Sequence, residues 1–234
     1  MTRSSGFNGR DVMFSRLKLL IVFPLWIITT AVGDDDFIIN DALINDVRRH
    51  YGKAASERMI RWQGLLDGSL HLTDRQKLTV VNDFFNEQRF INDIDHWGKD
   101  DFWATPVEFL GSGGGDCEDF SIAKYYTLRQ LGIPDKKLRV TYVMALEYQQ
   151  AHMVLSYYPE PDTEPLILDN LNKRILPASE RRDLKPVYNF NGDGLWYARQ
   201  QGNSGKRIGK SSRVGRWTKL RNRFQQSIAN SQEE

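Results

Sequence analysis

Cysteine is almost absent from this sequence, since Cys117 is the only one among 234 residues. A single cysteine cannot form an intrachain disulfide, and no cluster of cysteine and histidine has the spacing of a zinc site. The sequence also lacks a P-loop and the glycine fingerprint of a dinucleotide-binding fold. These absences argue against a disulfide-stapled scaffold, a zinc-binding module and the common nucleotide-binding enzymes.

A long hydrophobic run is missing as well. The apolar run Leu19–Val32 has 14 residues, which is short of the roughly 20 that a membrane-spanning helix needs. Arg16 and Lys18 precede it, and it ends in small residues that fit a signal-peptidase site. Residues 1–33 are therefore predicted to be a signal peptide for export, with an N-terminal membrane anchor or a buried helix as the alternatives.

Net charge is small but unevenly distributed. The whole chain carries +2, of which residues 1–33 contribute +3 and residues 200–234 contribute +6, so that residues 34–199 carry −7. An acidic centre suits a divalent cation better than a nucleic acid. We therefore expect no nucleic-acid partner, and we interpret residues 201–234 as a basic C-terminal tail.

The lone cysteine lies in an unusual setting. Three glycines, Gly113–Gly115, and Asp116 precede Cys117, and a helical pattern follows it. A thiol in the first turn of a helix is favoured as thiolate by the helix dipole, and the free backbone N–H groups there can steady an oxyanion. The neighbouring Glu118 and Asp119 raise a thiol pKa unless a metal ion or an imidazolium offsets them. A small buried hydrophobic side chain is the alternative interpretation of a lone cysteine.

The periodicity of apolar residues predicts helices first and strands later. Segments 37–51, 54–67 and the region after Thr73 read as amphipathic helices, with Gly68 ending the second. A further helix is expected from Cys117 to about Leu131. Strands are expected at the three segments 138–146, 151–158 and 166–169. The predicted fold class is α+β, with a helical N-terminal part packed on an antiparallel β-sheet.

Residues 92–101 break this periodicity. The segment is rich in aspartate, asparagine and glycine, which are typical of a surface loop. Its carboxylates make it a possible second source of metal ligands.

The last two predicted strands bring a histidine and an aspartate together. If Tyr158 pairs with Pro165 across the connecting hairpin, then His152 faces Leu171 and lies diagonally beside Asp169. A thiol at a helix start, an imidazole on one strand and a carboxylate on the next form the arrangement of an activated nucleophile. Cys117, His152 and Asp169 are therefore the candidate catalytic residues.

Several separated motifs resemble the LapG family of bacterial transglutaminase-like cysteine proteinases. They are Gly-Gly-Asp-Cys-Glu-Asp-Phe at 114–120, Ala-His-Met-Val-Leu at 151–155 and Leu-Asp-Asn at 168–170, with further likeness at 103–110 and 192–196. The resemblance spans roughly residues 35–200, which we take as one protease domain, 34–200. It implies a papain-like, transglutaminase-like fold.

The same resemblance implies a function. Members of this family are calcium-dependent periplasmic endoproteases that clip the N-terminal region of a large cell-surface adhesin and so promote biofilm dispersal. An inner-membrane receptor of the LapD type, which senses cyclic di-GMP, holds them inactive. We accordingly expect Ca²⁺ as cofactor, such an adhesin and such a receptor as partners, and the periplasm as location.

The family pattern also assigns roles to residues. It implies Cys117 as nucleophile, His152 as base and acid, and Asp169 as the residue that orients the imidazole. The acidic residues Asp116, Glu118 and Asp119 carry over as the calcium-associated group. An acidic cluster that only caps the helix is the alternative.

Two alternatives to the protease function stay open at the level of sequence. The same three residues serve a transglutaminase or another acyl transferase when an amine replaces water in the second step. A catalytically idle periplasmic binding module is the other. In the tail, apolar residues at helical spacing from Trp217 to Ile228 are interleaved with basic ones. That pattern indicates either a basic amphipathic helix for an anionic membrane or acidic partner, or a solvated terminus.

Overall fold

A computed structural model describes residues 37–198 and 205–232 of the chain. The predicted signal peptide at 1–33 therefore lies outside the described residues. The described residues all belong to one compact unit, Val32–Glu234. None of the helices in these two ranges is long and apolar enough to cross a membrane.

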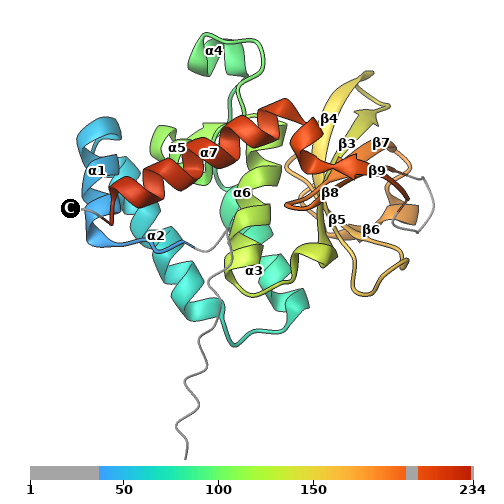
Figure 1. Ribbon diagram of the computed structural model, residues 1–234, viewed down its shortest axis with the longest axis horizontal. Coiled ribbons are helices and arrows are strands. Elements are labelled where there is room, and N and C mark those ends of the chain that lie inside the picture. Colours follow the sequence, from blue (N-terminus) through green and yellow to red (C-terminus); the bar gives the residue numbers. More distant parts are fainter. Residues whose placement is uncertain (1–36, 199–204, 233–234) are drawn as a thin grey trace, which may run out of the picture. The chain divides into compact units, whose positions relative to one another are not determined.

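Helices dominate the first half of the unit and strands the second (Figure 1). The α-helices are α1 (Asp41–Tyr51), α2 (Lys53–Ser69), α3 (Asp74–Asn86), α4 (Asp93–Trp97), α5 (Pro106–Ser112), α6 (Cys117–Gln130) and α7 (Gly215–Asn230). The strands are β1 (Arg89–Phe90), β2 (Gly114–Gly115), β3 (Leu138–Ala145), β4 (Gln150–Tyr157), β5 (Leu166–Leu168), β6 (Leu176–Pro177), β7 (Leu184–Phe190), β8 (Gly194–Tyr197) and β9 (Lys206–Lys210). Short 3-10 helices occur at Asp135–Lys137, Ala178–Glu180 and Ser211–Arg213.

The helix starts follow the local sequence. Thr73 and Gln76 form a reciprocal capping box at the start of α3, and Thr105 and Glu108 form another at the start of α5, where Pro106 takes the first helical position. Gly68 does not end α2 as predicted, because the helix continues through it to Ser69. One glycine weakens a helix without terminating it.

The expected loop at 92–101 contains α4, a short helix. Its Asp93 is buried, and the αL conformation of Gly98 (φ 62°) ends it. Five residues are too few for the apolar periodicity that reveals a helix in a sequence. The segment is therefore partly helical and carries one buried carboxylate, whereas its composition indicated a surface loop.

Seven strands form an antiparallel sheet in the order β6-β5-β4-β3-β7-β8-β9. In the hairpin between β4 and β5, Leu155 pairs with Leu168 and Tyr157 with Leu166. This is the register that the sequence predicted, so the alternation of side chains places His152 and Asp169 as expected. The fold class is α+β, as predicted.

Helix α6 lies at the centre of the core between the other helices and the sheet (Figure 1). It contacts α3, α5, β3 and β4, and all its residues from Glu118 to Leu128 are buried. A helix enclosed on every side cannot shift without disrupting the whole core. The residues at its N-terminus are consequently held on a rigid support.

Helix α7 differs from both sequence interpretations of the tail. Its apolar residues Trp217, Leu220, Phe224 and Ile228 are all buried in the main core. The Trp217 ring stacks on Tyr126 with a centroid distance of 5.6 Å, and Phe224 contacts Phe37 edge-on at 5.1 Å. The amphipathic pattern does form a helix, as one of the two interpretations had it, but the apolar face of this helix packs on the core of the same chain. The tail also contributes β9, which forms one edge of the sheet.

We expect Trp217→Ala to lower the free energy of unfolding by roughly 3–5 kcal/mol, because it removes a fully buried indole from the core. Lys219→Ala, at an exposed position two residues away on the same helix, should change it by less than about 0.5 kcal/mol. Urea unfolding followed by circular dichroism measures both. Equal stability of the Trp217 variant and the wild type would contradict the integration of α7 into the domain.

Candidate active site

Cys117 is the first residue of α6. Steric constraints require glycine at the two positions just before Asp116. A Cβ on Gly114, whose φ is 157°, would lie 2.1 Å from the carbonyl oxygen of Arg89 across the β1–β2 pair. A Cβ on Gly115 would lie 2.1 Å from Oδ2 of Asp119. Only glycine fits such close approaches. These close approaches fix the path of the backbone into α6, so that the thiol lies at the N-terminus of the helix.

The half-buried thiol lies in a cleft of ≈ 440 Å³. Sγ donates to Oε2 of Glu118 at 3.2 Å, and the backbone N–H of Met153 donates to Sγ. Burial first, and then the charges of Glu118 and Asp116, raise the pKa of the Cys117 thiol well above its usual value. A compensating positive charge is thus required for a thiolate, as the sequence indicated.

His152 opens into the same cleft from strand β4, and it is paired with Asp169. Its Nε2 lies 2.8 Å from Oδ1 of Asp169, and both side chains are almost fully buried. Because Nε2 is engaged, Nδ1 is the ring nitrogen available to a partner in the cleft. The structure therefore brings Cys117 and His152 to one cleft with Asp169 directly behind the imidazole.

The negative charge of Asp169 is compensated on the side away from His152 by Arg181. This residue was not identified from the sequence. Nη2 of Arg181 lies 2.7 Å from Oδ2 of Asp169, and the same guanidinium binds Asp183. Burial opposes ionisation, but the hydrogen bonds and charges of His152 and Arg181 outweigh it and lower the pKa of Asp169 to about 2. The ionised Asp169 carboxylate therefore stabilises the fold fully above the ordinary carboxyl pKa, and this stabilisation is lost as the pH falls toward 2.

A second support holds the backbone of this aspartate. Nδ2 of Asn86 donates to the carbonyl oxygen of Asp169 at 2.9 Å, and the buried Lys124 donates to Oδ1 of Asn86 at 2.8 Å. Burial lowers the pKa of Lys124 to about 7. No local pattern marks Arg181, Asn86 or Lys124, because charged and amide side chains in isolation usually indicate a solvated surface.

Carboxylates from two segments, 92–101 and 116–119, gather beside the thiol. Oxygen atoms of Asp93, Asp116 and Asp119 lie within 4.8 Å of one another, and Asp93 and Glu118 form a similar group with Asp101. The predicted ligand source at 92–101 does reach the cysteine helix. Of the expected acidic group, Asp116 and Asp119 converge with Asp93, while Glu118 accepts the hydrogen bond of the thiol and is grouped with Asp116 and Cys117.

The cluster is short of positive charge. Burial, followed by repulsion among the carboxylates, raises the pKa of Asp116 to about 11 and that of Asp93 to about 6. Oδ1 of Asp93 and Oδ1 of Asp116 are buried without a hydrogen-bond partner among the described residues. Hard oxygen atoms with repelling charges and unused lone pairs fit a divalent cation such as Ca²⁺. A helix cap alone leaves these atoms unexplained.

A thiol, an imidazole and a carboxylate on a helix and an antiparallel sheet define a papain-like, transglutaminase-like cysteine hydrolase. The model of a family described as bacterial transglutaminase-like cysteine proteinase matches residues 57–183. The chain belongs to this family and is a cysteine protease.

Solved structures agree with this assignment. Legionella pneumophila LapG is 44% identical, with a TM-score of 0.68 over 77% of this chain and 93% of that one. Its EGTA-treated form has a TM-score of 0.69 and its calcium-bound form 0.67, each at 44% identity and 77% coverage of this chain, with 95% and 97% of those chains covered. The comparison with curated proteins gives no match.

Arg181→Met should lower the free energy of unfolding at pH 7 by roughly 3–5 kcal/mol, because it leaves the buried Asp169 carboxylate without its cation. Arg182→Met removes the same charge from the exposed neighbouring position and should be nearly neutral. Urea unfolding compares the two variants. A loss of similar size in both would show that net charge, and not the buried pair, is responsible.

Proposed function

We propose that this protein is a calcium-dependent periplasmic endoprotease that cleaves the N-terminal region of a large cell-surface adhesin. We further propose that a LapD-like cyclic di-GMP receptor inhibits it, so that its release promotes biofilm dispersal. Membership of the family and the 44% identity to a LapG that has been solved with calcium support this proposal. The placement of Cys117 and the His152–Asp169 pair around one cleft is the observation that carries it.

In the proposed reaction, Nδ1 of His152 accepts the proton of the Cys117 thiol, and Sγ attacks the carbonyl carbon of the scissile peptide bond. The backbone N–H of Cys117 at the start of α6 donates to the oxyanion that forms. The imidazolium then gives its proton to the leaving amine as the C–N bond breaks, which leaves an acyl-enzyme.

Water completes the cycle. His152 accepts a proton from the water that attacks the thioester, and the C–S bond then breaks as the imidazolium returns this proton to Sγ, which releases a carboxylic acid and the thiol. Asp169 accepts the hydrogen bond of Nε2–H throughout and stabilises the imidazolium. Arg181 keeps Asp169 ionised and fixed in this orientation.

The residues that would hold calcium are Asp93, Asp116 and Asp119, with Glu118 on the side of the thiol. A bound Ca²⁺ supplies the positive charge that offsets the carboxylates beside Cys117. The backbone N–H groups of Phe102 and Ala104 donate to Asp93 and Asp119 and fix the orientation of these carboxylates. The acidic cluster is thus proposed to couple calcium binding to the state of the nucleophile.

Cys117→Ala should abolish cleavage of an adhesin fragment, because the variant lacks the sulfur that forms the acyl-enzyme. Its unfolding midpoint and its binding to the receptor should stay near wild type. Mass spectrometry of the products after incubation with the largest repeat-containing adhesin of the host measures cleavage. Full activity of this variant would remove the protease mechanism, and cross-linking in place of cleavage when a primary amine is added would favour an acyl transferase.

Excess EGTA should abolish cleavage, and added Ca²⁺ should restore it. Asp93→Asn and Asp119→Asn should each weaken calcium binding by more than ~10-fold, because they remove a charged oxygen ligand. Asp95→Asn, at an exposed position of the same short helix α4, is the matched control and should bind calcium as the wild type does. Isothermal titration with CaCl₂ measures all four proteins, and undiminished cleavage in EGTA would contradict the calcium requirement.

A further inference from the structure

Helix α7 lies outside the residues 57–183 that the family model matches, yet it contacts the segment beside the acidic cluster. Arg216 and Arg223 are seven residues apart and therefore lie on one side of the helix, two turns apart. Nη2 of Arg216 lies 2.8 Å from Oδ2 of Asp101, and Arg223 contacts residues 102–108. Figure 1 shows α7 in the C-terminal colour, lying along the side of the domain that carries α5 and α6.

Arg223 makes three kinds of contact with this segment. Its Nη2 donates to the carbonyl oxygen of Trp103 at 2.5 Å. Its Nε and Nη2 each lie 3.2 Å from an oxygen of Glu108, the partner of Thr105 in the capping box of α5. Its guanidinium also lies 4.6 Å from the centre of the Phe102 ring. A planar fork with several fixed donors can make all of these contacts at once.

The same segment orients the acidic cluster. Phe102 N–H donates to Oδ2 of Asp93, and Ala104 N–H donates to Oδ1 of Asp119 at 2.6 Å. The carbonyl group that Arg223 binds belongs to Trp103, the residue between these two donors. Arg223 therefore fixes the short stretch of backbone whose N–H groups set the position of two carboxylates.

We infer that Arg223 is a positioning residue for the acidic cluster, and that α7 thereby sets the calcium affinity of the protease. This inference rests on the proposed role of the cluster as the calcium site. Outer-shell groups that orient metal ligands typically change metal affinity by roughly 10–100-fold when they are removed. Arg223 acts one step further out, through the backbone of 102–104, so the low end of that range is expected.

Electrostatics and positioning predict opposite results for the loss of Arg223. A positive charge near a cation site repels the cation, so its removal alone should increase calcium affinity. Loss of the contacts to Trp103 and Glu108 should instead decrease it, because the ligands are then less well oriented. The sign of the change therefore distinguishes positioning from a charge effect.

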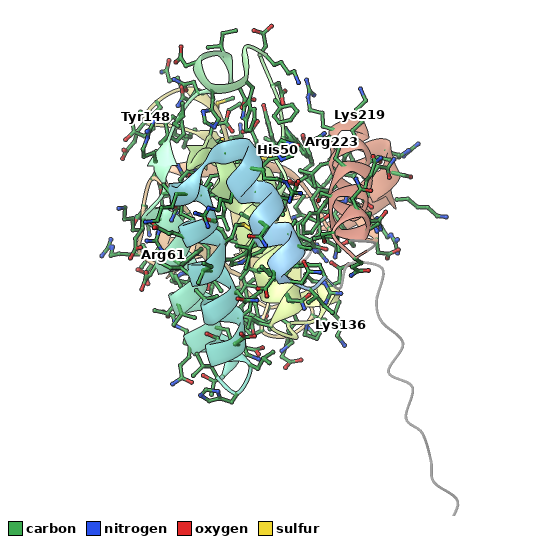
Figure 2. All side chains as sticks on the ribbon, turned by 90° about the vertical axis from the view of Figure 1, so that its left-hand side faces the viewer. His50, Arg61, Lys136, Tyr148, Lys219 and Arg223 are labelled. Carbon is green, nitrogen blue, oxygen red and sulfur yellow. The ribbon has the colours of Figure 1, made fainter. Side chains whose placement is uncertain are left out.

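The test is isothermal titration of EGTA-stripped full-length protein with CaCl₂. Arg223→Met should weaken calcium binding by about 10-fold. Lys219→Met removes the same charge from an exposed position one turn away on α7 and should leave the affinity within about twofold. Both residues are labelled on α7 in Figure 2. Arg223→Lys should give an intermediate loss, because an ammonium keeps the charge but not the fork.

Glu108→Gln provides a second route to the same contact. Glutamine preserves the capping box at the start of α5, while the ion pair to Arg223 is lost, so the fold should be retained if Arg223→Met destabilises it. We expect a smaller fall in calcium affinity, with the melting temperature in EGTA unchanged and the increase caused by CaCl₂ reduced. Wild-type affinity in both Arg223→Met and Glu108→Gln would overturn the inference, whereas a wild type that binds no calcium would overturn the proposed site itself.

Discussion

The accumulation of buried carboxylates at the start of α6 is the constraint on which the site depends. A helix N-terminus favours negative charge near it, but its dipole amounts to about half an elementary charge. Four carboxyl groups, Asp93, Asp116, Glu118 and Asp119, would exceed that if all were ionised, and burial together with their mutual repulsion raises the pKa of Asp116. A cation bound at such a cluster would offset these charges and favour the thiolate of the neighbouring Cys117.

The domain contains two buried acidic sites and compensates them differently. Asp169 has its partners within the chain, the cation Arg181 and the hydrogen-bonded His152, and its pKa is lowered to about 2. The cluster around Asp116 has backbone N–H groups but no buried lysine or arginine bonded to it among the described residues, and the pKa values of Asp93, Asp116 and Asp119 are raised. The first site is therefore charged at neutral pH, whereas the second has the oxygen atoms and the unmet charge that fit a cation from solution. The Cys117 thiol adjoins the second site, since it donates a hydrogen bond to Glu118.

Local patterns predicted most of the elements and the catalytic strands. Apolar periodicity identified the helix after Thr73, and the pairing of Tyr158 with Pro165 across the hairpin gave the register that places His152 beside Asp169. The sequence was less informative about short elements and about contacts between residues far apart in the chain. Helix α4 is too short to show periodicity, and Arg181 has no local feature that distinguishes it from a surface arginine.

The sequence by itself determined the thiol at a helix start, the strands that carry the imidazole and the carboxylate, and the amphipathic character of α7. Each of these depends on residues close together in the chain. Only the tertiary structure decided that the apolar face of α7 packs on the core and that Arg181 pairs with Asp169. It also decided that the carboxylates of Asp93 and Asp119, which are far apart in the sequence, lie close together. The physical reason is that burial and charge compensation depend on which distant segments meet, and neither periodicity nor residue type specifies the partner of a buried surface or a buried charge.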